Sequence, residues 1–372
     1  MKGIMMHRML TGLVLAMAMA GAHTNALNAQ TRVTGDLTVA SDGPLEQTDG
    51  LETEYGTVST REGLRLRSVL TRPEGTSGRL PAIFVTQWVS CDSIIFPEGR
   101  DTQLRLLAQQ SGMVMIRIER SGTGDSEGPG CDKLDYDTEV RHYREALVQA
   151  KQHSWVDPQR VVILGSSLGS TTAPLVAQNG DVAGVVVQGG GAVTYLERMI
   201  HFERLYVERS GTVKPEDIHS EMLQRIAFLQ HYLIGQKTPD EVTSDHPDLA
   251  GIWQTIRGTD PENHYGRPFA WHWQAAEKNF LAAWLSLDVP VMVAFGEYEQ
   301  FESRHGHRMI VDMINQKTPG SAEWLEIKQA DHGLALYPNA LSAYAYENGA
   351  TAHQLYVAPV SQWLRRVVGL PK

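Results

Sequence analysis

Short apolar runs alternate with amphipathic segments over the first half of the chain. Four apolar runs are rich in β-branched or aromatic residues and show no polar alternation, which is typical of parallel strands buried on both faces. They cover residues 82–86, 113–118, 161–164 and 182–187. Helical spacing marks the intervening segments 101–110, 136–153 and 168–178. This alternation predicts a parallel sheet with helices on both faces.

Two further strands precede this region, and the alternation resumes near the C-terminus. Residues 54–58 and 64–70 alternate like the strands of a hairpin, with Arg61-Glu62-Gly63 as its turn. After residue 285 we expect strands at 289–295 and 324–327 and helices at 308–315 and 355–368. The α/β core is therefore predicted in two parts, at 51–194 and 286–372.

The segment 195–285 interrupts the alternation. It is rich in Glu, His, Arg, Tyr and Trp, and it is expected to form helices with irregular connections and no strand. We interpret it as a helical cap inserted between the two parts of the core. The expected fold class is α/β, with a mostly parallel central sheet, helices on both faces and this inserted cap.

The N-terminal segment has the pattern of an export signal. Residues 1–8 carry positive charge, residues 9–20 are apolar, and Ala20-Gly21-Ala22 has the small residues of a cleavage site. We predict a signal peptide over 1–22, with a second candidate cleavage region reaching residue 29, and a flexible lead-in over 23–50. The mature protein is therefore expected in the periplasm or outside the cell. A retained anchor is the alternative, although the apolar run is short for a membrane span.

The charge balance argues against two classes of partner. The chain carries 33 Lys and Arg against 43 Asp and Glu, a net charge of −10. An acidic chain is repelled by nucleic acid and by anionic membranes, so neither is an expected partner.

Two cysteines, Cys91 and Cys131, follow predicted strands that are expected to lie close together. An exported chain with an even number of cysteines permits a disulfide. We predict a bond between Cys91 and Cys131, with two buried free thiols as the alternative. Neither cysteine lies at a strand-to-helix turn, so a cysteine nucleophile is disfavoured.

The pattern G-x-S-x-G occurs twice, at 124–128 and 165–169. A serine nucleophile on such a motif needs a buried strand before it and a helix after it, because it stands on a sharp turn. Ser167 in the second copy meets both demands. Ser126 also follows a strand, but Pro129-Gly130 then favours a turn. Ser167 is therefore the predicted nucleophile, and Ser126 is predicted to be a loop residue.

A nucleophilic serine needs a general base, and the base needs an acid that holds its tautomer. His332 lies just after the last predicted strand, where sites form in open parallel sheets. The loop after 289–295 offers Glu297 and Glu299 as the acid. We favour Glu299, because two more residues beyond the strand extend its reach toward the next loop, and Glu297 stays open.

The negative charge that develops on a substrate carbonyl needs backbone N–H donors. One donor is expected from Leu168, directly after the nucleophile. Another is expected from the loop Gln87-Trp88-Val89 after the strand 82–86, where Trp88 and Val89 are the candidates.

Two other features of the chain carry candidate chemistry. Trp271 and Trp273 are expected to line the acyl side of the substrate pocket, or to pack the cap on the core. The histidines of His305-Gly306-His307 lack a third partner, so no metal site is predicted there. No metal or organic cofactor is expected.

These motifs together resemble the α/β-hydrolase superfamily, in its esterase and serine aminopeptidase branch. Residues 165–169, the loop 120–128, Gly296-Glu297-Tyr298-Glu299 and Asp331-His332-Gly333 carry the resemblance, within about residues 52–370. It implies an α/β-hydrolase fold with the order serine, acid, histidine, and a structural role for the loop 120–128. The chain departs from the family at three places. Glu299 stands for a more frequent Asp, Gln87-Trp88 for His-Gly, and Ser170 for a frequent glycine.

We expect an exported serine hydrolase that cleaves carboxylic esters through an acyl-enzyme, acting on a small-molecule ester or a short peptide. An aminopeptidase or dipeptidyl-peptidase-like activity is the nearest alternative, in which Glu203, Glu208 or Glu221 would bind the substrate's α-amino group. A non-catalytic binding protein on the same scaffold is a further alternative, because the Gln87-Trp88 loop is unusual.

Overall fold

The computed structural model describes residues 32–33, 50–95, 102–178, 180–256 and 260–371. The predicted signal peptide and most of the predicted lead-in lie outside these ranges, and both stay predictions. In the described part of the chain, no helix is both long and apolar enough to cross a membrane.

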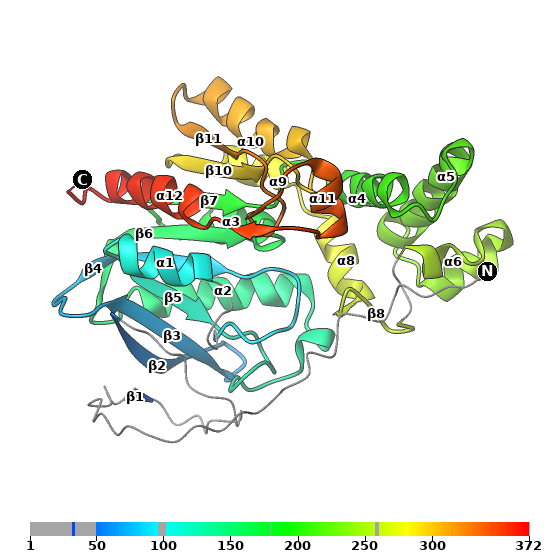
Figure 1. Ribbon diagram of the computed structural model, residues 1–372. Coiled ribbons are helices and arrows are strands. Elements are labelled where there is room, and N and C mark those ends of the chain that lie inside the picture. The colour runs from blue at the N-terminus through cyan, green and yellow to red at the C-terminus, as the bar shows by residue number, and fades with distance from the viewer. Residues whose placement is uncertain (1–31, 34–49, 96–101, 179, 257–259, 372) are drawn as a thin grey trace, which may run out of the picture. The chain divides into compact units, whose positions relative to one another are not determined.

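Nine strands form one central sheet in the described residues (Figure 1). Its order is β1-β2-β3-β5-β4-β6-β7-β10-β11. β3 runs antiparallel to β2 and β5, and the other neighbours are parallel. The strands are β1 (Arg32–Val33), β2 (Leu51–Ser59), β3 (Arg65–Pro73), β4 (Leu80–Thr86), β5 (Val114–Ile118), β6 (Val156–Ser166), β7 (Gly184–Gln188), β10 (Val291–Gly296) and β11 (Ala322–Ile327).

Helices flank this sheet and fill the segment between β7 and β10. The α-helices are α1 (Thr102–Gln110), α2 (Tyr136–Ala150), α3 (Gly169–Ala177), α4 (Tyr195–Ser210), α5 (Ile218–Leu229), α6 (Pro239–Asp245), α7 (Ile252–Thr255), α8 (Phe269–Ala276), α9 (Phe280–Leu285), α10 (Arg304–Lys317), α11 (Ala340–Ala345) and α12 (Gln354–Val367). Shorter helical turns are η1 (Cys131–Lys133), η2 (Pro215–Asp217), η3 (Gln230–Ile234) and η4 (Pro247–Leu249).

Successive side chains of the central strands enter opposite halves of the core, because side chains alternate across a strand. In β4, Ala82 and Phe84 pack with the cluster that includes α2, α3, α9 and α10. Ile83 and Val85 pack with the cluster of α1 and α12. Figure 1 shows α1 and α12 together on one face of the sheet. Both faces are therefore covered, which explains the unbroken apolar runs of the sequence.

The segment between α7 and α8 corrects the prediction that no strand forms in 195–285. β8 (Asn263–His264) pairs with β9 (Arg267–Pro268). Tyr265 and Gly266 between them have φ of 52° and 72°. Two positive φ values match the two-residue turn that suits a hairpin. Strands of two residues are too short to show an alternation of apolar and polar residues, so the sequence pattern did not predict this hairpin. The pattern did not predict β12 (Ala335–Leu336) and β13 (Ala350–Thr351) for the same reason.

Candidate active site

Ser167 lies at a sharp strand-to-helix turn. β6 ends at Ser166 and α3 begins at Gly169. Ser167 has φ of 52°, which is rare for a residue with a side chain and typical of a serine nucleophile at this kind of turn. A Cβ on Gly169 would come within 2.1 Å of the Thr86 carbonyl oxygen, so only glycine lets α3 begin this close to β4.

Ser126 has a different environment in the loop after β5. Its Oγ accepts from the Arg67 backbone N–H at 2.9 Å and donates to the Glu119 carbonyl at 3.1 Å. The two bonds tie the hydroxyl to the backbone of β3 and to the backbone just after β5. The contacts of Ser126 therefore hold the loop after β5 in place.

Three side chains from separate loops form a hydrogen-bonded chain. Ser167 Oγ lies 2.9 Å from His332 Nε2, and His332 Nδ1 lies 2.8 Å from Glu299 Oε2. The other Glu299 oxygen accepts from the backbone N–H groups of Phe301 at 2.8 Å and Glu302 at 3.2 Å. The carboxylate is thus held at both oxygens and has one orientation toward the imidazole.

Glu297 contacts other groups. Its carboxylate accepts from the Gln329 backbone N–H at 2.9 Å and lies 3.4 Å from Lys328 Nζ. Of the two acids in this loop, the structure brings Glu299 to His332.

The electrostatics of the Glu299–His332 pair favour the charged carboxylate. Burial acts to raise the pKa of Glu299, but the facing His332 and the backbone N–H donors hold it below its ordinary value. Burial acts to lower the pKa of His332, but the Glu299 charge raises it above its ordinary value. Glu299 is therefore ionised and ready to stabilise an imidazolium.

Two glutamine side chains hold the backbone of His332 in place, one from the end of β7 and one from the loop after β10. The Gln188 side-chain amide donates to the His332 carbonyl at 2.6 Å, and Gln300 Oε1 accepts from the His332 backbone N–H at 3.1 Å. Gly189 has φ of 89°, and a Cβ there would come within 2.7 Å of His332 Cε1. The glycine after β7 therefore makes the space that the imidazole occupies.

A cavity of about 430 Å³ opens beside these groups. Aromatic and sulfur side chains supply much of its wall. It is lined by Trp88, Val89, Ser90, Gln103, Ser166, Ser167, Leu168, Gln188, Tyr195, Arg198, Met199, Phe202, Tyr265, Phe301, Glu302, His332 and Gly333. The wall includes all three predicted N–H donors, Leu168, Trp88 and Val89.

Of the two interpretations of Trp271 and Trp273, the structure supports packing of the cap on the core, because the described wall of this cavity includes neither residue. Trp271 is buried, and its indole N–H donates to Glu139 Oε2 at 2.9 Å. Trp273 packs partly buried against the hydrophobic core. Tyr195, Phe202 and Tyr265 supply the cap's aromatic wall instead.

Buried arginines hold the carbonyls of the loop after β4. Arg120 Nη1 donates to the Ser90 carbonyl at 2.6 Å, and Nη2 donates to the carbonyls of Gln87, at 3.0 Å, and Trp88. The described residues contain no cis peptide bond, and a trans peptide points its N–H opposite to its carbonyl. The N–H groups of Trp88 and Val89 therefore point away from Arg120.

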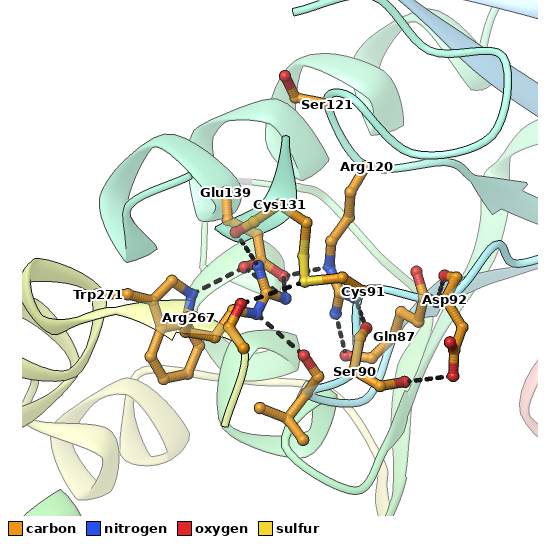
Figure 2. The surroundings of a disulfide bond; sticks show 12 residues. Gln87, Ser90, Cys91, Asp92, Arg120, Ser121, Cys131, Glu139, Arg267 and Trp271 are labelled. Carbon is orange, nitrogen blue, oxygen red and sulfur yellow. Dashed lines mark hydrogen bonds and ion pairs between the residues drawn. A yellow bond between two sulfur atoms is a disulfide. The ribbon is translucent and has the colours of Figure 1, made fainter. Parts of the chain in front are cut away.

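Glu139 connects Arg120 to a second arginine, Arg267 of β9 (Figure 2). Arg120 Nε donates to Glu139 Oε1 at 2.7 Å, and Arg267 Nη2 lies 3.3 Å from Glu139 Oε2. Arg267 Nε also donates to the Val89 carbonyl at 2.9 Å. Burial acts to raise the pKa of Glu139, but the two guanidinium groups hold it below its ordinary value. The loop is thus fixed by a charged, buried cluster drawn from three parts of the chain.

The sulfurs of Cys91 and Cys131 are bonded, and the bond lies beside this cluster in Figure 2. It joins the end of the Trp88–Val89 loop to η1, with a sequence separation of 40. Arg267 Nη1 donates to the Cys131 carbonyl at 3.3 Å. The disulfide and the arginines therefore restrain the same loop.

Comparisons with known proteins assign the chain to a family. The sequence model of the alpha/beta hydrolase family matches residues 88–344. This chain is an alpha/beta hydrolase. The predicted resemblance and the predicted fold class are confirmed.

Individual relatives of this hydrolase are distant. A stretch of 111 residues is 30% identical to the polyketide transferase ATR5 of Stachybotrys chlorohalonatus (strain IBT 40285). It covers 30% of this chain and 35% of the relative, so the match spans about a third of that protein.

Two solved structures share its fold. The Pyrococcus furiosus esterase Pf2001 has a TM-score of 0.54 at 11% identity, covering 88% of this chain and 96% of the esterase. The carboxylesterase EstE1, cloned from a metagenomic library, has a TM-score of 0.50 at 16% identity, covering 89% and 92%.

The carboxylates named for a peptidase have partners elsewhere in this hydrolase. Glu203 and Glu221 both pair with Arg225, and Glu208 lies 3.7 Å from Arg204. None of the three lines the cavity described above. In the described residues, no group of three or more His, Cys, Asp or Glu could hold a metal ion.

Several residues of the site escaped sequence reasoning. Arg120 had a weak signal, because it lies two residues after a strand at the edge where sites form. Gly189 had another, as the first of three glycines after a strand. Glu139 and Arg267 had none, because their contacts join segments that are far apart in the chain.

Proposed function

We propose that this hydrolase cleaves carboxylic esters of small molecules through a covalent acyl-enzyme. In this proposal Ser167 is the nucleophile, His332 the general base and then the acid, and Glu299 the group that orients His332. The hydrogen-bonded chain from Ser167 Oγ through His332 to Glu299, at the wall of an open cavity, carries the proposal.

The reaction follows from these contacts. His332 Nε2 takes the hydroxyl proton as Ser167 Oγ attacks the ester carbonyl carbon, and the carbonyl electrons move onto oxygen. The N–H of Leu168, with that of Trp88 or Val89, donates to this oxyanion. His332 then gives its proton to the departing alcohol, leaving an acyl-enzyme. Water deprotonated by His332 then attacks the acyl carbon. The bond from this carbon to Ser167 Oγ breaks, His332 returns the proton to Oγ, and the carboxylic acid leaves.

The cavity favours an ester over a peptide with a free N-terminus. Such a peptide needs a carboxylate that is free to receive the α-amino group. Glu302 is the acidic residue in the described wall, and both its oxygens accept from Arg198. The α-ammonium group of a peptide would there meet the Glu302 carboxylate already paired with Arg198, beside the side chains of Met199 and Phe202. The surrounding side chains suit an apolar acyl or aryl group instead.

We also propose that the hydrolase is exported and works in the periplasm or outside the cell. The predicted signal sequence supports export, and the Cys91–Cys131 disulfide suits an oxidising compartment. N-terminal sequencing of the mature protein tests this, and a chain that begins at Met1 in the cytoplasm would contradict it.

Labelling with a fluorophosphonate probe tests the mechanism. We expect the wild type and Ser126→Ala to be labelled, Ser167→Ala not to be labelled, and His332→Ala to be labelled slowly. In parallel, aryl butanoates should be hydrolysed faster than aminoacyl anilides. A folded wild type that neither reacts with the probe nor hydrolyses the ester would refute the proposal and favour a binding role. Faster anilide hydrolysis would favour a peptidase.

A further inference from the structure

A second cavity of about 160 Å³ adjoins the first. Phe202 and Phe301 line both cavities. Their ring centroids are 5.5 Å apart, so the two side chains form a partition between them. The Phe301 ring also meets the edge of His332, with 5.0 Å between centroids. The partition therefore stands directly beside the proposed catalytic base.

One face of α4 runs along both cavities. Tyr195, Arg198, Met199 and Phe202 line the first, and Phe202, Leu205, Tyr206 and Arg209 line the second. Steps of three and four residues put all of them on one side of the helix. From Arg198 to Arg209 this face extends about 16 Å, at 1.5 Å per residue. The two cavities thus lie in sequence under a continuous wall.

The second cavity differs from the first in its charge. Arg198 in the first is neutralised by Glu302. Arg209 in the second forms no ion pair with the residues that the structure describes, and the described lining contains no acidic side chain. The Arg209 guanidinium lies 3.6 Å from the Tyr344 ring centroid, and Nη1 donates to the Glu299 carbonyl at 3.4 Å. A half-buried guanidinium without an ion-pair partner can bind a carboxylate through charge-assisted hydrogen bonds.

The nearby carboxylates leave this site open to an anion. Glu208 lies near Arg209 on the same helix, but it is exposed and 3.7 Å from Arg204. Glu299 faces His332 through its side chain and offers Arg209 only its backbone carbonyl. Burial lowers the pKa of Arg209, which marks a cation that has lost part of its hydration.

We propose that the second cavity is the distal subsite for the substrate of the ester hydrolysis proposed above. It takes the far end of an elongated ester whose apolar acyl chain ends in a carboxylate. The reacting carbonyl lies at Ser167, the chain follows the face of α4 past Phe202 and Phe301, and the terminal carboxylate pairs with Arg209. Rotation of the two phenylalanine rings joins the cavities, a motion that side chains make readily.

Hydrolysis of matched aryl esters tests the subsite. The substrates are the aryl monoester of a long-chain dicarboxylic acid, the aryl alkanoate of equal chain length, and the aryl butanoate. For the wild type we expect kcat/KM for the acid-ended ester to exceed that for the matched alkanoate by about tenfold, the scale of one charge-assisted hydrogen bond. Arg209→Gln should abolish this preference, and Arg209→Lys should keep part of it.

Arg204→Gln is the matched control, because it removes a half-exposed cation of the same helix that lines neither described cavity. It should leave the preference unchanged. Equal rates for the two long esters in the wild type would overturn the inference, and so would a preference that survives Arg209→Gln. Hydrolysis of the butanoate separates the two proposals. If the butanoate is cleaved without any preference among long esters, the subsite fails alone. If no ester is cleaved, the proposed function fails with it.

Discussion

Arg120 offers the sharpest test of how the proposed oxyanion loop is held. The side chain is buried and donates to the carbonyls of Gln87, Trp88 and Ser90 and to the carboxylate of Glu139. Arg120→Lys keeps the charge beside Glu139. A lysine ammonium is a point charge, however, and lacks the planar fork that serves several acceptors at once. The substitution therefore releases loop carbonyls without leaving the carboxylate unpaired.

The size of the effect follows from these bonds. Two lost hydrogen bonds from a charged donor destabilise the fold by about 3 kcal/mol or more, before any partial rescue by the ammonium. Once the carbonyls are free, the Trp88 and Val89 peptides can rotate, and their N–H groups no longer have one direction. Loss of one oxyanion donor lowers kcat by about 10²–10³-fold. KM should change little, because the donors act mainly on the transition state.

Steady-state hydrolysis of an aryl butanoate measures both constants, and thermal unfolding identifies a temperature at which the variant is folded. Arg365→Lys is the matched control. Arg365 also donates to backbone carbonyls, those of Ser111 and Pro371, but it lies near the C-terminus and outside the described cavity wall. We expect the control to keep its activity. A folded Arg120→Lys with the wild-type kcat would refute the view that Arg120 directs the loop N–H groups.

Three further predictions concern the base, the acid and the disulfide. Gly189→Ala places a methyl group within 2.7 Å of His332 Cε1. We expect kcat to fall by about 10²-fold or more, as for a misplaced catalytic group. Circular dichroism should show that the fold is retained. Normal activity there would contradict the assigned position of the imidazole. In the proposed mechanism activity needs neutral His332, so kcat/KM should fall as pH drops through the raised pKa of this residue. Glu299→Gln removes the charge that raises this pKa, so the acid limb should move to lower pH while kcat falls on the order of 10⁴-fold; an unmoved limb would assign it to another group. Replacing Cys91 and Cys131 together with alanine should lower the free energy of unfolding by about 2–4 kcal/mol for a loop of this length, measured by urea titration, and equal stability would contradict the cross-link.

The sheet and its flanking helices could be predicted because their cause is local. A buried parallel strand such as β6 must be apolar on both faces, and its helix must carry an apolar stripe, so both leave a pattern in the sequence. The turn at Ser167 could be predicted for the same reason, because the strand before it and the helix after it each leave a pattern in the sequence. His332 and Glu299 could be named because loops after parallel strands meet at one edge of the sheet.

The rest of the site depends on contacts that the sequence does not encode locally. Arg267 reaches the Val89 carbonyl from 178 residues away. Nothing near either residue indicates that contact. The two interpretations of Trp271 stayed open in the sequence for a related reason. An apolar side chain in the cap can face a cavity or the core, and only the packed structure shows that its indole meets Glu139.

The origin of Arg267 gives the cap a role that reaches beyond the choice of substrate. In a modular enzyme, a cap could be exchanged for another to alter specificity while the catalytic machinery stayed intact. Here the β8–β9 hairpin of the segment 195–285 inserts a guanidinium into the core and holds the carbonyl of Val89. A chimaera with a foreign cap would therefore need its own cation at this position.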